Sequence, residues 1–448
     1  MKPLSALVLD EKPVIAVRIQ PAGVTTRRSF HLALLLDTSG SMHGEGITTL
    51  KRTLHLLIDE MVDGDILTLI EYNSVANAIA PTTELNVTTR PILHAAVDIL
   101  DADGGTNLEL GLVQLRETTG VTIDAVFILT DGHINLGIAS TKGLQRLLAA
   151  AIPVGTPVNT LGYGANHNTR LLRDMALNSR GTYTYADAAE MIPAIIGDIT
   201  GGLAAEVGRN ARIILSDGWL PQEIGTTDDG IYTIGTLIAD KTQWIVLEGN
   251  AIPAIPAIPA VHTLPTIRLE WCIGHDAVSA ECIVTDVIPE IEVSEQRDRA
   301  RVARAFHQLT NLLEFNQIDE ARRLLEMLHN DLEASAAKDR TLVIRLRAQI
   351  DEMQETLRTM YSAAPVLHRH HTGLFIDDNI MGPILSRLAA DTTTIGLQRG
   401  ILSMQSDSST TSNTTSLNPI ELHHTFSSPT QQRSAYTMVR HFSQIDPE

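Results

Sequence analysis

Short apolar runs alternate with amphipathic helical patterns over residues 29–202. Strands are predicted from aliphatic runs at 30–37, 65–72, 76–80, 124–131, 157–163 and 181–185. Helices are predicted between them, and the first places Leu50, Leu54 and Leu57 on one face. This alternation is typical of a parallel sheet covered by helices. We therefore predict a doubly wound, Rossmann-like α/β domain over residues 29–202.

The pattern changes over residues 203–293, where short runs alternate apolar and polar residues with a period of two. Such runs predict antiparallel strands, and together they favour a β-sandwich-like domain. The N-terminal run Pro13–Pro21 has the same character. We expect residues 1–28 to supply strands to this β-rich domain, so that the α/β domain is inserted in it; the alternative is that the β-rich domain simply follows. The repeat AIPAIPAIPA at 251–260 predicts an exposed polyproline-II loop, because proline cannot donate to a sheet.

The third pattern, over residues 294–362, is helical. Val302, Phe306 and Leu309 share one predicted face, and further leucine faces follow. We predict two or three hairpinned helices that form a small bundle. Residues 363–448 are mostly polar and include a Ser/Thr/Asn-rich stretch. Such a composition buries too little apolar surface to order itself, so this part is predicted to be a largely disordered tail.

Composition narrows the class of function. Acidic residues outnumber basic residues by 53 to 34, and the net charge is −19, which argues against broad nucleic-acid binding. Two cysteines cannot supply a disulfide framework. The N-terminus lacks the apolar segment of a secretory signal, and no run approaches the roughly 20 apolar residues of a membrane span. We expect a cytoplasmic protein, with the nucleus as the alternative; the sequence does not indicate an oligomeric state.

Three polar features are predicted to meet at one edge of the α/β sheet. Asp37, Ser39 and Ser41 occur in the segment DTSGS at the end of the first strand. Thr106 lies in a loop after two glycines, and Asp131 ends a later strand. In open α/β sheets, ligands bind outside the carboxyl ends of the strands. The residues are therefore candidates for one site.

Oxygen atoms without Cys or His ligands indicate a hard cation. We predict Mg²⁺, with Mn²⁺ or Ca²⁺ as alternatives. If some direct ligands are neutral hydroxyls, the ion stays electrophilic toward an incoming anion. That chemistry suits the capture of a ligand better than a closed structural site.

The residues of this predicted site resemble the metal-ion-dependent adhesion site of the von Willebrand factor A family. The matching segments are DTSGS, GGTN and LTDG, within about residues 30–200. The resemblance implies that Ser39, Ser41 and Thr106 bind the metal directly, and that Asp37 and Asp131 act directly or through water. It also implies that a Glu or Asp side chain of a partner protein completes the coordination.

Three further residues follow or lie within the metal-binding segments. His43, Asn107 and His133 are predicted to lie on the rim of the site, where they would contact the partner. A Ser39 nucleophile with His43 as its base is disfavoured, because a hydroxyl that binds a metal is poorly placed for acyl transfer. No phosphate-binding loop and no Gly-x-Ser-x-Gly motif occurs, so we predict that the chain is not an enzyme.

The flanking regions resemble a narrower, intracellular group in which a β-rich and helical region called Vwaint follows the A domain, and several members of this group act in ubiquitin transfer. Residues 300–334 carry this second resemblance, but no zinc-binding pattern typical of a RING finger is present. The leading hypothesis is a metal-dependent protein-binding adaptor. The alternative is a substrate-recruiting subunit of a ubiquitin ligase or an AAA+ ATPase. A nucleic-acid-binding A domain conflicts with the charge. The tract His368-Arg369-His370-His371 is expected to be a solvated basic tract, with transition-metal binding as its alternative.

Overall fold

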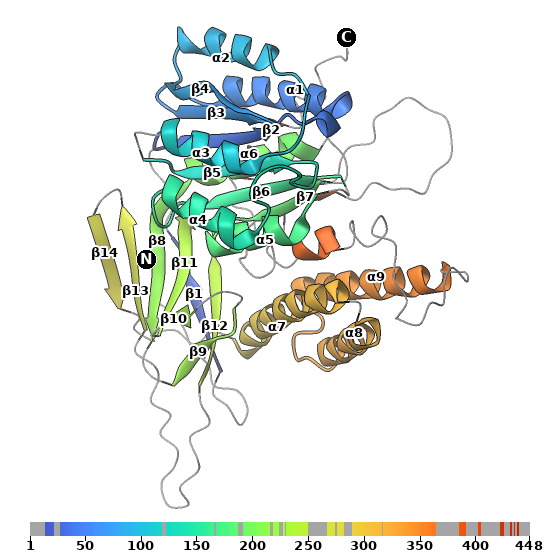
Figure 1. Ribbon diagram of the computed structural model, residues 1–448. Coiled ribbons are helices and arrows are strands. Elements are labelled where there is room, and N and C mark those ends of the chain that lie inside the picture. The colour runs from blue at the N-terminus through green and yellow to red at the C-terminus, as the bar shows by residue number, and fades with distance from the viewer. Residues whose placement is uncertain are drawn as a thin grey trace, which may run out of the picture. The chain divides into compact units, whose positions relative to one another are not determined.

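The computed structural model divides the chain into two compact units, each described separately below (Figure 1). The α/β unit contains residues 24–171, 184–206 and 399–448. The second unit, called the sandwich–helix unit after its β-sandwich and its helices, contains residues 1–23, 172–183 and 207–398. The predicted domain limits ran without interruption over 29–202, whereas this division assigns residues 172–183 to the other unit. The structure describes residues 14–21, 27–118, 122–164, 167–186, 191–215, 218–223, 227–228, 230–249, 267–273, 276–281, 289–315, 317–363, 385–390, 402–404, 422–424, 431, 434 and 437–438.

A six-stranded sheet has the order β4-β3-β2-β5-β6-β7. Its strands are β2 (His31–Asp37), β3 (Ile66–Tyr72), β4 (Ala76–Glu84), β5 (Ala125–Thr130), β6 (Val158–Tyr163) and β7 (Tyr183–Ala186). Strand β2 pairs in parallel with both β3 and β5, and β5 pairs in parallel with β6. The edge strand β4 pairs antiparallel with β3. The chain thus winds outward from β2 in both directions, as predicted for a doubly wound fold.

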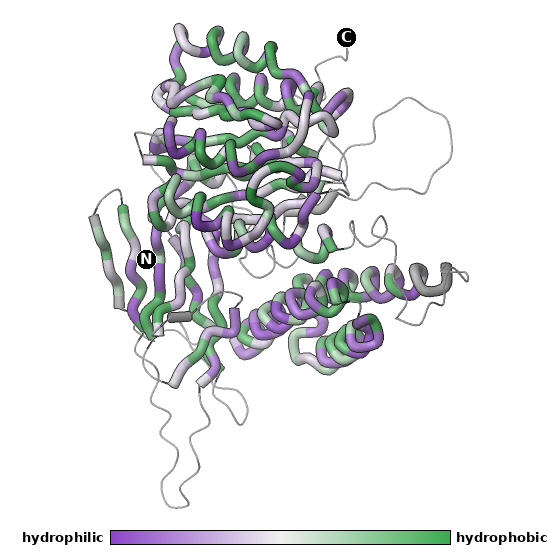
Figure 2. Tube along the Cα trace, in the orientation of Figure 1, coloured by the Kyte–Doolittle hydropathy of each residue, from purple (hydrophilic) through white to green (hydrophobic). Residues whose placement is uncertain are grey.

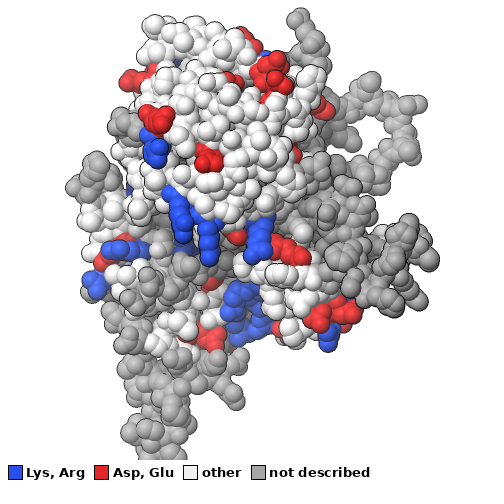
Figure 3. Space-filling model, viewed as in Figure 1, with Lys and Arg blue, Asp and Glu red and all other residues white. Residues whose placement is uncertain are grey.

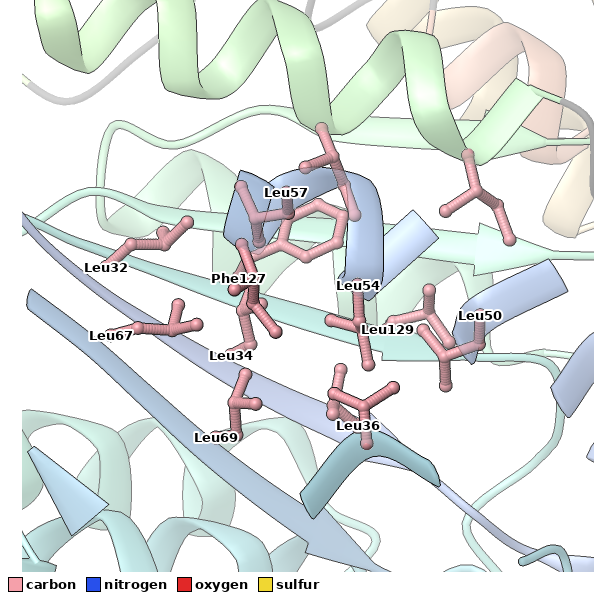
Figure 4. Packing of buried hydrophobic residues seen from close by; sticks show 14 of the residues in the cluster. Leu32, Leu34, Leu36, Leu50, Leu54, Leu57, Leu67, Leu69, Phe127 and Leu129 are labelled. Carbon is pink, nitrogen blue, oxygen red and sulfur yellow. The ribbon is translucent and has the colours of Figure 1, made fainter. Parts of the chain in front are cut away.

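Helices follow these strands along the chain. They are α1 (Glu45–Glu60), α2 (Thr89–Asp98), α3 (Leu108–Thr118), α4 (Thr141–Ala151), α5 (Thr169–Asn178) and α6 (Ile192–Ala204), with a short 3-10 helix η1 (Gly40–Met42) before α1. Side chains alternate between the faces of a strand, so Leu32, Leu34 and Leu36 of β2 all point to one face. They belong to the same buried cluster as Leu54 of α1 and Ile195 of α6. Figure 4 shows the three leucines of β2 together with Leu54. The central strands β2 and β5 are buried along their whole length, as expected of strands covered on both faces, and the sheet is coloured mainly as hydrophobic (Figure 2).

Two antiparallel sheets form the β-rich part of the sandwich–helix unit. One has the order β1-β12-β9 and the other β10-β11-β8-β13-β14. Their strands are β1 (Val14–Ile19), β8 (Glu206–Leu215), β9 (Trp219–Pro221), β10 (Thr227–Asp228), β11 (Ile231–Ile238), β12 (Gln243–Gly249), β13 (Ile267–Ile273) and β14 (Asp276–Glu281). Residues of both sheets, including Ile15, Ile213 and Leu247, share one buried cluster, which is the packing of a β-sandwich. Because β1 pairs antiparallel with β12, the N-terminal strand does join the later strands, as predicted.

The sandwich–helix unit also contains the helices α7 (Glu290–Glu314), α8 (Ile318–Glu333) and α9 (Thr341–Ala363). Val293 and Ala300 of α7 pack against Val14 and Val246 on the outer face of the three-stranded sheet. The remaining apolar faces of the helices form a core of their own. Helix α7 begins at Glu290, earlier than the predicted Ser294, because the acidic Glu290 and Glu292 in its first turn are favourable near the positive end of the helix dipole.

Most of the predicted tail and the repeat at 251–260 lie outside the described residues. Two described parts of the tail are packed, which the polar composition did not predict. Leu388, in the helical segment 385–390, belongs to the core of α7, α8 and α9. Met438 belongs to the core of the α/β unit. A short strand pair, β15 (Leu402–Met404) and β16 (Leu422–His424), lies between them in the sequence.

Candidate metal centre

The candidate site lies at the carboxyl ends of the neighbouring strands β2 and β5. Asp37 is the last residue of β2, and Asp131 directly follows β5. The chain continues from β2 to β3 on one side and later to β5 on the other side. This edge is therefore the switch point at which open α/β sheets bind ligands. The parallel pairing of β2 and β5 brings the two aspartates to the same edge.

The carboxylate of Asp37 is fully buried and held at both oxygen atoms. Its Oδ1 accepts a hydrogen bond from the backbone N–H of Ser39 at 2.9 Å. Its Oδ2 accepts one from the hydroxyl of Thr130 at 2.5 Å. The turn after β2 and the end of β5 therefore fix the orientation of this side chain.

A chain of oxygen atoms continues from Ser39 to Asp131. The hydroxyl oxygens of Ser39 and Ser41 are 3.1 Å apart. The Ser41 hydroxyl donates to Oδ1 of Asp131 at 2.6 Å. Ser39 and Asp131 are buried, whereas Ser41 is exposed, so the chain of oxygens reaches from the interior to the surface.

The loop that carries Thr106 is held from both sides. The Thr106 N–H donates to Oδ1 of Asn135 at 2.8 Å, and the N–H of Asn135 donates back to the Thr106 carbonyl at 3.2 Å. On the other side, the Gly105 N–H donates to the hydroxyl of Ser74 at 2.9 Å. Gly104 has φ +75°, a conformation that favours glycine and lets the loop turn here.

Gly132 shows that the Thr106 hydroxyl joins the same group of oxygens. A Cβ atom added at Gly132 would lie 3.4 Å from the Ser41 hydroxyl oxygen and 3.6 Å from the Thr106 hydroxyl oxygen. Both hydroxyls therefore border the backbone of Gly132. The structure thus brings together all five residues that the sequence predicted as metal ligands.

The two carboxylates have no cationic partner within the described residues. Burial raises the pKa of Asp131 to about 6, and the negative charge of Asp37 adds to this effect. Burial also raises the pKa of Asp37, although hydrogen bonds from Thr130 and Ser39 oppose the shift. In the described part of the chain, neither aspartate forms an ion pair with Lys or Arg. A cation bound here would relieve this unfavourable burial of charge.

The donor set fits a hard divalent cation. Two carboxylates and three hydroxyls supply oxygen ligands only, which suits Mg²⁺, Mn²⁺ or Ca²⁺. Among the described residues, no group of three His, Cys, Asp or Glu side chains is placed to hold a metal. The hydroxyls are therefore essential to this candidate centre.

The three predicted rim residues differ in their surroundings. His43 and His133 are exposed, as contact with a partner would need. The Asn107 side chain is half-buried, and its Oδ1 accepts a hydrogen bond from the Leu110 N–H at 3.3 Å. Asn107 thus caps the start of α3, which orders the loop next to Thr106.

The sequence did not assign roles to Thr130, Asn135 and Ser74, which orient the predicted ligands. Thr130 could have been found, because it directly precedes Asp131 at a strand end. Asn135 and Ser74 depend on which loops touch, and the sequence carries no local signal for that. The histidine tract at 368–371 lies outside the described residues.

Most of the α/β surface in view is uncharged, with acidic side chains placed apart from one another (Figure 3). Among the described helices, none is long and apolar enough to cross a membrane.

Comparisons with known proteins agree with this fold. Residues 31–197 match the family model of the von Willebrand factor type A domain. The uncharacterized protein YfbK of Escherichia coli (strain K12) is 26% identical over 201 residues, and the match covers 43% of this chain and 35% of YfbK. The chain therefore spans only about a third of this relative.

Two solved structures cover most of the chain. The von Willebrand factor type A protein from Catenulispora acidiphila has a TM-score of 0.60 and 13% identity, and the match covers 88% of this chain and 97% of that one. The ArnB paralog VWA2 from Sulfolobus acidocaldarius has a TM-score of 0.53 and 13% identity, with 88% and 96% covered. At these identities the likeness concerns the fold alone.

Proposed function

Because residues 31–197 form a von Willebrand factor type A domain, we propose that the chain is a divalent-metal-dependent protein-binding module. In this proposal, Ser39, Ser41 and Thr106 hold a Mg²⁺ ion directly, and Asp37 and Asp131 bind it directly or through water. The ion would supply an electrophilic centre for an Asp or Glu side chain of a partner protein. The proposal includes no enzymatic step.

One observation carries this proposal, namely the two buried carboxylates without a cationic partner beside three converging hydroxyls. The chain's own groups orient the ligands. Thr130 and the Ser39 backbone fix the Asp37 carboxylate, and Asn135 fixes the Thr106 loop. Because Ser41 is exposed, an anion from solvent can approach the oxygen chain at its middle member.

Affinity capture with and without Mg²⁺ tests the proposal. We expect proteins captured by the full chain in Mg²⁺ to be lost in EDTA. Asp37→Ala and Thr106→Ala should each weaken Mg²⁺ binding by about 100-fold or more, measured by calorimetry. Asp63→Ala is a matched control, because Asp63 is exposed and pairs with Arg90 instead.

Capture that persists in EDTA and in both site variants would rule the proposal out. The captured proteins also separate the two forms of the hypothesis. A ubiquitin ligase or AAA+ ATPase among the Mg²⁺-dependent partners would support the role of a recruiting subunit. Its absence, with other acidic partners present, would support a simple adaptor.

A further inference from the structure

A second polar cluster lies on α1 and α2, outside the candidate metal centre. His55 and Asp59 are one turn apart on α1, and His94 and Asp98 are one turn apart on α2. The Nδ1 atoms of the two histidines are 2.7 Å apart. Nε2 of His55 lies 3.0 Å from Oδ1 of Asp98, and Nε2 of His94 lies 3.1 Å from Oδ1 of Asp59. Each histidine thus contacts the aspartate of the opposite helix.

The two rings meet edge to edge. Their centroids are 5.0 Å apart and their planes differ by 19°. With the facing nitrogens at only 2.7 Å, this separation places the nitrogens between the rings and excludes face-to-face stacking. The ring edges that carry Nδ1 therefore point at each other.

The hydrogen bonds of the aspartates determine what can lie between these nitrogens. Asp59 and Asp98 have side chains that are 63% and 68% exposed, so both are solvated carboxylates that can only accept hydrogen bonds. The Nε2 atoms must then carry the protons, which leaves an unprotonated Nδ1 on each neutral ring. Two lone pairs cannot face each other at this distance, so either a shared proton or a metal ion lies between them.

We propose that His55 and His94 form a binding site for a divalent transition-metal ion of the Zn²⁺ class, with Nδ1 of each ring as the ligand. Imidazole nitrogen suits Zn²⁺, Ni²⁺ and Cu²⁺, in contrast to the oxygen ligands of the candidate Mg²⁺ centre. A carboxylate on the other ring nitrogen is the usual arrangement of metal-binding histidines, and here it occurs twice.

The geometry needs only a small adjustment. Tetrahedral Zn²⁺ with bonds of about 2.0–2.1 Å separates two nitrogens by about 3.3 Å, so the rings would move apart by roughly 0.6 Å. Both histidine side chains are 29% exposed, and solvent can supply the remaining ligands. In the described part of the chain, Lys51 is the cation that reaches this cluster, and it donates to the main-chain oxygen of Asp98, 2.9 Å away, without pairing with the carboxylate.

Zn²⁺ titration of the full chain tests this proposal. The background variant carries His368→Ala, His370→Ala and His371→Ala, because that tract could bind the same ions. Calorimetry is performed in excess Mg²⁺, which occupies oxygen sites. We expect one Zn²⁺ per chain, and at least about tenfold weaker binding in His55→Gln and in His94→Gln. Asp98→Asn should weaken binding by about 10–100-fold, because it removes the negative charge next to Nε2 of His55.

His329→Gln is the matched control. His329 is similarly exposed and contacts Asp351 at 2.9 Å, but it belongs to the separate α8–α9 contact. Its variant should bind Zn²⁺ as the background does. Equal Zn²⁺ affinity in His55→Gln and in the control would overturn the proposal, as would no Zn²⁺ binding by the background chain, which would mean that a shared proton is the cation. Asp37→Ala should keep Zn²⁺ binding, so this result is independent of the Mg²⁺ centre.

Discussion

At the scale of single residues, Asp37 and Asp131 lower the stability of the protein when no cation is bound. Burial raises the pKa of Asp131 to about 6, above its ordinary value of 3.8. An acid with a higher pKa in the folded state lowers the free energy of unfolding at every pH where it is ionised. This penalty is present above about pH 6 and decreases as the pH falls toward the unfolded pKa.

Asp131→Asn should therefore have opposite effects in the absence and presence of metal. Without metal at pH 7.5, removing the buried charge should raise Tm by about 2–4 °C. With Mg²⁺, the variant should lose the stabilisation of the wild type, which amounts to about 2.7 kcal/mol when Mg²⁺ is at 100 times Kd. Thermal unfolding in EDTA and in Mg²⁺ measures both. The exposed Asp63→Asn is the control, and a lower Tm of Asp131→Asn in EDTA would refute the charge argument.

Four of the five predicted ligands, Asp37, Ser39, Ser41 and Asp131, could be predicted at this scale because they lie at or just after a strand end, whereas Thr106 lies in the loop between α2 and α3. Strand ends can be recognised from the aliphatic runs, and parallel pairing brings Asp37 and Asp131 to one edge. The residues that orient them are different. Asn135 lies in the loop after β5, and its contact with the Thr106 loop depends on the conformation of both loops.

At the scale of elements, a buried ion pair joins α7 to the β-sandwich. Arg299 of α7 and Glu223, which follows β9, have side chains that are 0% and 1% exposed. The guanidinium donates to both carboxylate oxygens of Glu223, at 3.0 and 2.5 Å. Glu223 also accepts the backbone N–H of Val246 on β12. The pair satisfies its own charges, but neither member can be removed alone without leaving a buried charge.

Arg299→Met should lower the free energy of unfolding by about 3–5 kcal/mol, because it leaves Glu223 buried and unpaired. The double variant Arg299→Met with Glu223→Leu should recover much of this loss. Urea unfolding of the wild type, Arg299→Met, Glu223→Leu and the double variant gives the coupling energy between the two side chains. Arg323→Met, which breaks an exposed pair with Glu320, should change stability by less than about 1 kcal/mol. A double variant as unstable as Arg299→Met would contradict this account.

Periodicity in the sequence was sufficient for most elements, because helices and strands bury apolar faces at different spacings. Periodicity gave the wrong element where a short segment fitted the spacing of a strand but forms a helix. Residues 290–293 (EIEV) alternate as a strand would, yet they form the first turn of α7. There, the favourable position of Glu290 and Glu292 in the first turn of a helix outweighs the period-two pattern.

At the scale of the whole molecule, both ends of the chain contribute to cores formed by distant segments. Strand β1 pairs with β12, which the alternating pattern of the N-terminal run had indicated. Met438 joins the core that includes Ile195 and Ile196 of α6. A single methionine in a polar stretch carries no periodic signal, so this second contact could not be predicted.

Gln431, Ser434 and Met438 recur at the spacing of one helical face, and the first two contact α6. The Gln431 amide donates to Oδ2 of Asp198 at 3.3 Å, and the hydroxyls of Ser434 and Thr200 are 3.4 Å apart. Met438 is 1% exposed. Two polar contacts to α6 and one side chain in the α/β core thus tie these residues to the α/β unit, so they should add to the stability of the proposed metal-binding domain.

Met438→Asp should therefore lower the free energy of unfolding by about 2–4 kcal/mol, because it places a charge in an apolar core. The loss should appear in the unfolding transition that Mg²⁺ stabilises, since Met438 packs within the α/β unit. Met327→Asp is the matched control, because Met327 of α8 is 57% exposed. Differential scanning calorimetry of both variants with Mg²⁺ compares their unfolding transitions. Equal unfolding profiles would mean that the α/β core is complete without the C-terminal segment, whereas a selective loss would make residues 431–438 part of the metal-binding domain.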